Sequence, residues 1–381
     1  MPRLPLLATL LAVGTALCAG ELPETAPDRP PHREEMHRVV EAIARLKLPE
    51  RKERLRALKT IQRFPDKAIP YLVIAARNDD AVFRARVANA LGLVGKGDRN
   101  ATWALTVLLR DPDTFVRREA IAAIVTAGET SMIPTIQELL KDRQPTVRAD
   151  AVNAIATLDP DGAPERMRVL LTHEDARVRR TALAQLLEAK PQGSAGLLVP
   201  LLKDTDAGVR GDAAAALART GGKAAAPALI ALLADPDPYV RASAIAGLKR
   251  LGATDATPRL VALLGDKDEN VRAEAIAALG SLRAASALPA LIGQLTAPTS
   301  RIRERTALAL GLYRAQAKAA APGLILLLDD ADQGVRQKAD LALHLILGTS
   351  VGFQAGGSSE HRREAIARWH EAYRKANPRK R

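Results

Sequence analysis

The sequence predicts an all-α solenoid, and three observations lead to this prediction. Residues 222–252 read GKAAAPALIALLADPDPYVRASAIAGLKRLG, and versions of this 31-residue segment fill most of the chain. An arginine that usually follows Val recurs once in each central copy, always at the same spacing. The composition is 47% apolar but only 3% aromatic, which suits short helices that pack closely. Repeats of this length stack on their neighbours and bury one continuous core, so the array forms a single extended domain.

Each copy is expected to form two helices joined by a turn. Residues 226–233 place leucines at helical spacing, which predicts a first helix with one apolar face. Asp237 is a suitable N-cap and Pro238 a suitable first residue for a second helix, which Gly252 would end. Two helices this short cannot bury enough apolar surface alone, so each unit needs neighbours.

Nine copies align on the recurring arginine. The marker arginines are Arg84, Arg117, Arg148, Arg179, Arg210, Arg241, Arg272, Arg303 and Arg336. The six central spacings are equal, and the first and last are each two positions longer. An apolar residue also recurs eight positions before and seven positions after each marker. Three columns in phase over nine copies predict a stack of about nine helical hairpins.

The repeat pattern P-x-L-x-x-L-L-x-D-x-D-x-x-V-R-x-x-A-x-x-A-L-G resembles the short HEAT-like repeats named after phycobilisome lyases. The resemblance covers roughly residues 66–348 and implies a HEAT-like superhelix. It implies no particular reaction, because repeats of this family serve many tasks. The lyases in the family's name attach or isomerise bilins on cysteines of antenna proteins, but nothing in this sequence matches a bilin site.

The composition along the chain divides it into seven segments. We expect a signal peptide at 1–20, a linker at 21–32, N-terminal capping helices at 33–65, the repeats at 66–348, a Gly/Ser loop at 349–357, a C-terminal capping helix at 358–377 and a basic tail at 378–381. The last helix carries Ile366, Trp369 and Tyr373 on one face, so it is expected to close the core. A glycine-rich loop followed by such a helix resembles the ending of many exported bacterial HEAT-like proteins.

The N-terminal segment predicts export. Arg3 precedes an apolar run over residues 4–17, which is too short to span a bilayer comfortably, and small residues follow it. Cleavage after Gly20 would release the protein to the periplasm, the cell envelope or the medium, without its only cysteine. A lipoprotein modified at Cys18 is disfavoured, because Leu17 stands where that motif prefers a small residue. The alternative is an apolar N-terminal helix of a cytoplasmic protein.

Two columns of carboxylates precede the marker arginines. Aspartates four positions before the marker form the expected N-cap column, which Gln144 and Thr299 interrupt. Aspartates six positions before it can neutralise an arginine that lies near a helix N-terminus. We expect a ladder of Asp–Arg pairs along the stack, made by Arg117, Arg148, Arg210, Arg241, Arg272 and Arg336 with Asp111, Asp142, Asp204, Asp235, Asp266 and Asp330. A catalytic role is disfavoured because the pattern recurs in every repeat. Repeat eight has Ala297 and Thr299 in place of both carboxylates, which indicates a local irregularity or a bend.

The position two residues after each marker is expected to point away from the core. It is acidic in the middle of the stack, at Glu119, Asp150, Asp212 and Glu274, and basic at its ends. One turn further on, the same face carries mostly small residues. Second helices usually line the concave side of such solenoids, so these residues predict a groove with an acidic ridge. A protein or peptide partner fits this groove, although the row is equally consistent with ordinary solvated residues.

Composition and motifs favour a non-enzymatic binding protein. The net charge of +13 can attract nucleic acid or an anionic membrane, but the predicted groove lacks the Lys, Arg and aromatic rows that nucleic acid needs. The basic cluster at residues 51–63 is interpreted as the charged face of a capping helix. The six histidines have no ligand spacing, and no phosphate-binding loop or nucleophile motif occurs, so we expect no metal, cofactor or catalytic residue. The leading hypothesis is an exported, monomeric scaffold that binds a protein or peptide. The alternatives are a cytoplasmic nucleic-acid-binding solenoid and a protein related to bilin lyases.

Overall fold

The computed structural model describes residues 30–188 and 195–377, and every regular element in these ranges is a helix. The chain divides into two compact units between Pro191 and Gln192. The predicted signal peptide, most of the linker and the basic tail lie outside the described residues. Within the described residues, no helix is both long enough and apolar enough to span a membrane.

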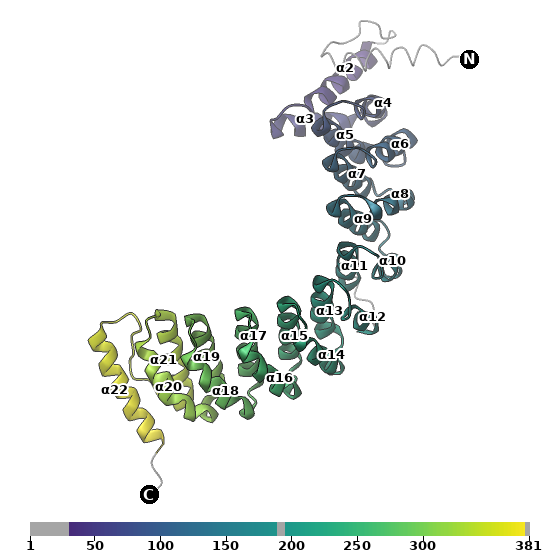
Figure 1. The fold of residues 1–381 in the computed structure, drawn as a ribbon. Coiled ribbons are helices and arrows are strands. Elements are labelled where there is room, and N and C mark those ends of the chain that lie inside the picture. The colour runs from purple at the N-terminus through teal and green to yellow at the C-terminus, as the bar shows by residue number, and fades with distance from the viewer. Residues whose placement is uncertain (1–29, 189–194, 378–381) are drawn as a thin grey trace. The chain divides into compact units, whose positions relative to one another are not determined.

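The first unit begins with two helices and continues with four hairpins. Its helices are α2 (Pro30–Arg45), α3 (Arg51–Arg63), α4 (Pro65–Ala75), α5 (Ala81–Val94), α6 (Arg99–Leu108), α7 (Thr114–Ala127), α8 (Ile133–Glu138), α9 (Pro145–Leu158), α10 (Ala163–Leu170) and α11 (Ala176–Glu188). The first helices of the hairpins form one layer, which consists of α4, α6, α8 and α10. The second helices, α5, α7, α9 and α11, form the other layer (Figure 1).

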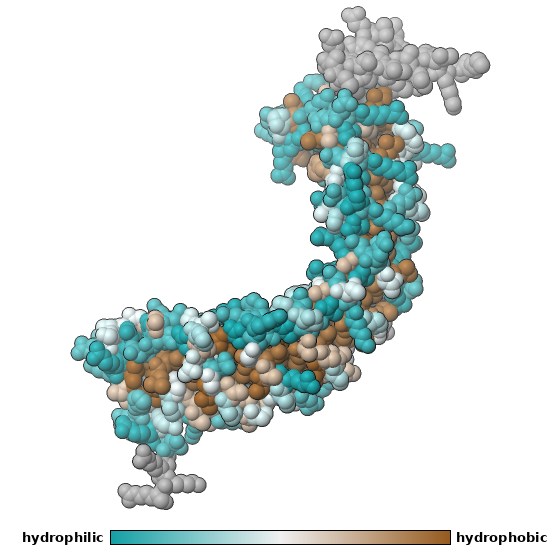
Figure 2. Space-filling model, viewed as in Figure 1, coloured by the Kyte–Doolittle hydropathy of each residue, from teal (hydrophilic) through white to brown (hydrophobic). Residues whose placement is uncertain are grey.

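The second unit contains five hairpins and a final helix. Its helices are α12 (Ala195–Leu201), α13 (Ala207–Thr220), α14 (Ala226–Ala231), α15 (Pro238–Leu251), α16 (Thr257–Ala262), α17 (Glu269–Leu282), α18 (Leu288–Gly293), α19 (Ser300–Leu312), α20 (Ala321–Leu326), α21 (Gln333–Leu347) and α22 (Ser359–Ala376). Figure 2 shows mostly hydrophilic residues along the second helices of this unit and a more hydrophobic band over its first helices. The fold is therefore the predicted all-α solenoid.

The core lies between the two layers of each unit. The apolar column seven residues after the marker is fully buried, for example at Leu91, Ile124, Leu248 and Leu279. The second helices approach one another closely where glycine faces the next repeat. A Cβ at Gly92 would lie 2.6 Å from the Cα of Ala123, so only glycine allows α5 and α7 to pack at this distance.

The first α-helix of the repeat at residues 222–252 is shorter than the sequence predicted. A helix was predicted over residues 226–233, but α14 ends at Ala231 and a 3₁₀ turn follows over Leu232–Ala234. The amide of Asp235 donates to the carbonyl oxygen of Leu232 at 3.1 Å, which is the tighter bond of a 3₁₀ turn. This tightening satisfies a carbonyl at the helix end and turns the chain toward the next helix within few residues.

The predicted N-cap column is confirmed. Asp80, Asp113, Asp206, Asp237, Asp268 and Asp332 each accept a hydrogen bond from a backbone amide in the first turn of the following helix. Gln144 precedes α9 without making such a bond. Each second helix of this set therefore starts at a position that its local sequence specifies.

Replacing Gln144 with aspartate should stabilise the first unit. Asp237 caps α15 before a proline at the first helical position, and Gln144 precedes Pro145 in the same way. We expect Gln144→Asp to add a cap worth about 0.5–1 kcal/mol to the free energy of unfolding, measured by urea denaturation. The matched control is Gln144→Asn, which can cap without adding charge. No gain in either variant would contradict the prediction.

The C-terminal helix closes the second unit, as its apolar face predicted. Trp369 on α22 is fully buried, and its indole Nε1 donates to Oδ1 of Asp340 on α21 at 2.9 Å. The loop before α22 contributes as well, because Arg336 Nε donates to the carbonyl oxygen of Ala355 at 2.8 Å. Trp369 therefore packs as a core residue and also holds a carboxylate of the last repeat.

Candidate partner-binding surface

The arginine and aspartate columns meet between successive repeats. Arg117 donates from Nε to Oδ2 of Asp142 at 2.7 Å and from Nη2 to Oδ1 at 2.8 Å. Its Nη1 donates to the backbone carbonyl oxygen of Asp111 at 2.9 Å. The same arginine therefore closes its own loop and reaches the loop of the following repeat. The described carboxylate pairs are Arg84–Asp111, Arg117–Asp142, Arg148–Asp175, Arg210–Asp235, Arg241–Asp266 and Arg303–Asp330.

The membership of this ladder differs from the sequence-based expectation. That expectation selected arginines whose own repeat carries the aspartate, but the partner carboxylate belongs to the next repeat. Arg84 and Arg303 consequently join the ladder. Arg272 and Arg336 were expected in it and make no hydrogen bond to a carboxylate in the described part of the chain. Asp204 accepts a bond from the amide of Asp206 through Oδ1 at 2.8 Å.

One rung uses a substitute carboxylate. The position six residues before Arg179 is His173, so Arg148 pairs with the N-cap residue Asp175 at 2.6 Å. Burial raises the pKa of Asp175, but the hydrogen bonds from Arg148 and the Val178 amide outweigh it and keep the pKa below the usual value. Asp175 therefore serves as both cap and ladder partner.

The four acidic residues of the second helices, Glu119, Asp150, Asp212 and Glu274, are half-buried. Asp150 accepts a 2.5 Å hydrogen bond from Arg118 Nε, and Asp212 accepts one of 2.6 Å from the Tyr239 hydroxyl. Glu274 lies 3.7 Å from the ammonium group of Lys249. Sequence reasoning missed all three neighbours, because each comes from an adjacent repeat and falls outside the acidic column.

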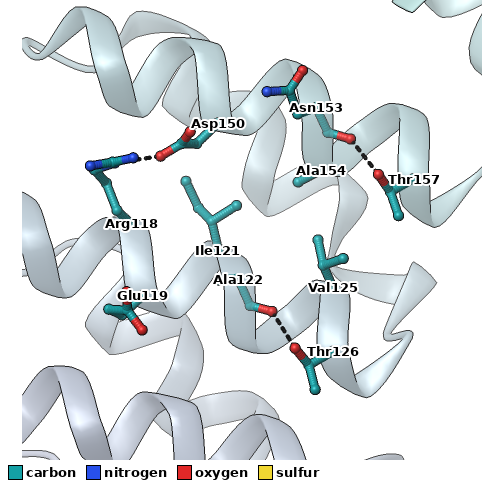
Figure 3. A pocket seen from close by; sticks show the side chains of 10 residues that line it. All are labelled: Arg118, Glu119, Ile121, Ala122, Val125, Thr126, Asp150, Asn153, Ala154 and Thr157. Carbon is teal, nitrogen blue, oxygen red and sulfur yellow. Dashed lines mark hydrogen bonds and ion pairs between the residues drawn. The ribbon is translucent and has the colours of Figure 1, made fainter. Parts of the chain in front are cut away.

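A depression of about 460 Å³ lies between α7 and α9 in the first unit (Figure 3). Its lining consists of Arg118, Glu119, Ile121, Ala122, Val125, Thr126, Asp150, Asn153, Ala154 and Thr157. Figure 3 shows the Arg118–Asp150 pair at one end and the two threonines at the other, with apolar side chains between them. Both threonine hydroxyls donate to carbonyl oxygens of their own helices, Ala122 and Asn153, at 2.9 Å. The structure thus brings two of the predicted acidic residues into one concave site, whereas Asp212 and Glu274 lie on α13 and α17 of the second unit.

Two groups of this depression have shifted pKa values, the Glu119 carboxylate and the Arg118 guanidinium. Burial raises the pKa of Glu119 above the usual 4.5, and the opposing effect of nearby Arg118 is smaller. A raised carboxylate pKa means that folding favours the protonated form. The ionised carboxylate therefore reduces stability at neutral pH.

Glu119→Gln should be at least as stable as the unchanged protein at pH 7. Glu119 opposes folding when it is ionised, and this effect disappears below its unfolded pKa of about 4.5. The difference in unfolding free energy between the two proteins should therefore shrink as the pH falls from 7 toward 4, measured by urea denaturation at each pH. A variant that is clearly less stable at pH 7, with a gap that persists at pH 4, would contradict this assignment.

The described ranges contain no cluster of three or more His, Cys, Asp or Glu residues that could hold a metal ion. The lining of the depression combines two carboxylates, a guanidinium, an amide and two hydroxyls with small and branched apolar side chains. Such groups can bind a partner's basic and apolar side chains.

Comparisons with solved structures identify similar α-solenoids. Kap121p bound to the extreme C-terminus of the protein phosphatase Cdc14p matches with a TM-score of 0.57 and 16% identity over 97% of this chain and 51% of that chain. Kap95p, in a study of its binding to RanGDP, matches with a TM-score of 0.57 and 12% identity over 97% of this chain and 61% of that chain. Kap121p bound to the SUMO protease Ulp1p matches with a TM-score of 0.53 and 15% identity over 90% of this chain and 49% of that chain. The chain thus spans about half the length of these proteins, and the likeness shows the fold alone.

The comparison with family models is more specific. No curated protein matches the sequence. The model for HEAT repeats matches residues 101–187, 163–249 and 226–311, which together cover residues 101–311 without a gap. Because this continuous stretch is more than half of the chain, the protein belongs to the HEAT-repeat family.

Proposed function

We propose that this protein is a non-catalytic scaffold that binds a protein or peptide through the face formed by its second helices. The observation that carries the proposal is the depression between α7 and α9, where carboxylates flank an apolar floor. A single extended side chain with an apolar stem and a charged head fits this combination. The fold supports the proposal in general terms, because stacked repeats present extended surfaces to partners.

The chemistry of the depression favours a basic partner. Glu119 is partly desolvated, and its ionised form lacks a direct hydrogen bond from a cation among the described residues. A lysine or arginine side chain from a partner would compensate that charge and place its methylene groups against Ile121 and Val125. We therefore propose a partner segment that carries Lys or Arg beside apolar residues.

The solved neighbours are compatible with such a role. Kap121p binds the extreme C-terminus of the protein phosphatase Cdc14p in one solved structure and the SUMO protease Ulp1p in another. A solenoid of this fold thus binds other proteins. For this chain we propose binding as a monomer, and export directed by the segment at 1–20.

The proposal can be tested with peptides selected from a random displayed library on the folded protein. We expect the selected peptides to be enriched in Lys or Arg flanked by apolar residues. The double variant Glu119→Gln/Asp150→Asn should bind them about fivefold to tenfold more weakly, measured by fluorescence anisotropy, because about 1 kcal/mol of charge pairing is lost. Circular dichroism would establish that the variant retains its helices.

A matched control comes from the other layer of the same unit. Glu138 on α8 is exposed and pairs with Arg110 at 2.9 Å. Glu138→Gln removes one carboxylate from the first-helix layer and should leave peptide affinity unchanged. Equal losses in both variants, or selection of acidic peptides, would overturn the proposed surface. Tight binding of duplex DNA with a steep salt dependence would favour the nucleic-acid alternative.

A further inference from the structure

The intact rungs of the ladder define a carboxylate site with a fixed composition. Three rungs, including Arg241–Asp266, join an arginine to the aspartate 25 residues later. Asp266 accepts bonds from Nε and Nη2 of Arg241 at 2.8 and 2.7 Å, and its Oδ1 also accepts from the amide of Asp268 at 2.9 Å. Each carboxylate of this kind therefore receives three donors, two from the arginine fork and one from the loop backbone.

The rung that begins at Arg272 has these donors without the carboxylate. The residue at the corresponding position of the next loop is Ala297, a methyl group where the other repeats carry aspartate. Arg272 uses Nη1 for the carbonyl oxygens of Asp266 and Lys267, as the other marker arginines do in their own loops. Its Nε makes no hydrogen bond among the described residues, and its side chain is 25% exposed, against 6% for Arg241. The fork of Arg272 is thus open where that of Arg241 is filled.

The loop of repeat eight adds further unpaired polar groups at this rung. Thr299 precedes α19 at the N-cap position, but its side chain makes no capping hydrogen bond. Its Oγ1 is buried and has no hydrogen-bond partner. Its amide corresponds to the amide of Asp268 that binds the aspartate in the preceding rung, and it makes no hydrogen bond in the described structure. A buried hydroxyl without a partner is costly, so a group that binds here would satisfy it.

The surrounding charges favour a small anion with a single charge. Arg301 lies in the first turn of α19, directly after the loop of residues 297–299. Its Nη1 donates to Oδ1 of Asn270 at 2.8 Å. Glu269 is shared between Arg272 and Arg301 at 3.8 Å from each, so it offsets part of their charge. Two guanidinium groups therefore face one carboxylate, which leaves the site with about one uncompensated positive charge.

We propose that the gap between Arg272 and the loop of residues 297–299 binds a carboxylate group supplied by another molecule. Because Ala297 replaces the aspartate, Nε of Arg272 lacks an acceptor among the described residues. An arginine fork matches a carboxylate in plane and spacing. The group can come from an aspartate or glutamate side chain or from a chain terminus. In both cases the bound carboxylate replaces the side chain that repeat eight lacks.

Two small probes distinguish these sources. Acetate represents an acidic side chain, and N-acetylglycine represents a chain terminus. We expect each effective probe to raise the unfolding midpoint by about 2 °C over chloride at equal ionic strength and pH, because it binds the folded protein only. A response to acetate alone assigns a side chain as ligand, whereas a larger response to N-acetylglycine assigns a terminus.

A matched variant supplies the missing carboxylate from the protein's own chain. Ala297→Asp restores the residue of the other rungs, so it should raise the unfolding midpoint by about 2–4 °C without any probe and abolish the response to both probes. Arg272→Lys keeps the charge but removes the fork, and it should also lose the response. If Ala297→Asp responds to acetate as the unchanged protein does, or if the unchanged protein responds to neither probe, the proposed site is wrong.

Discussion

Arg241→Ala should be among the most destabilising substitutions of the ladder. Arg241 is buried, binds both oxygens of Asp266 and donates to the carbonyl oxygens of Asp235 and Pro236 at 2.8 and 3.0 Å. Its removal would leave a buried carboxylate and two carbonyl groups without their donor. We expect a loss of about 3–5 kcal/mol in the free energy of unfolding, measured by urea denaturation.

The control for this substitution lies on the same helix. Arg250 is exposed in the last turn of α15, and Arg250→Ala should change stability by less than about 0.5 kcal/mol. A similar, small loss in both variants would show that the ladder contributes little.

The same rung predicts a pH dependence. Burial raises the pKa of Asp266, but the hydrogen bonds from Arg241 and the Asp268 amide outweigh it and hold the pKa below 3.8. A depressed pKa contributes stability that is present above the unfolded pKa and lost as the pH falls through the folded value. The unchanged protein should therefore lose more stability than Arg241→Ala between pH 5 and pH 3.

Trp369→Ala should detach the C-terminal helix from the second unit. The indole is fully buried and is the largest such side chain in the described structure. Its truncation removes the packing between α22 and the last repeat and leaves Asp340 without the indole donor. We expect a loss of about 3–5 kcal/mol. Hydrogen exchange should show α22 losing protection while the amides of α13 retain it.

A second substitution separates packing from hydrogen bonding. Trp369→Phe keeps an aromatic ring but removes the donor to Asp340. Burial raises the pKa of Asp340, and the indole bond opposes this shift, so loss of the bond should raise the pKa further. We expect a smaller loss of stability than in Trp369→Ala, and one that is reduced at pH 4. Equal losses in the two variants would assign the whole effect to the hydrogen bond.

Local signals in the sequence predicted those parts of the fold that neighbouring residues determine. Asp237 and Pro238 specify the start of α15 through capping and a fixed backbone angle, and Gly252 ends the helix in the left-handed conformation. Trp369 was predicted as a core residue from its helical face alone. Its partner Asp340 could not be predicted, because the contact depends on how α22 lies across the last hairpin.

The candidate site was less predictable for the same reason. The acidic column containing Glu119 and Asp150 follows from the period of the repeat. Its neutralisation by Arg118 does not, because that contact depends on the offset between α7 and α9 in the stack. The same offset determines that each paired arginine of the ladder binds the aspartate of the following repeat. Sequence spacing alone suggested that each arginine pairs with the aspartate of its own loop. In the stack, each paired arginine instead binds the aspartate of the next loop.

The direction of the ladder makes the two ends of the repeat array chemically different. An array in which every arginine reaches forward must end with a guanidinium that has no following loop to bind. Here that last guanidinium belongs to Arg336, and the backbone oxygen of Ala355 receives it. The segment after the repeats thus ends the ladder, because its backbone accepts a hydrogen bond from the Arg336 guanidinium that the loop of another repeat would otherwise accept. Duplication of an internal repeat would continue the arginine–aspartate pattern in register. A repeat added after Leu347 would instead have to displace the contact between Arg336 and Ala355.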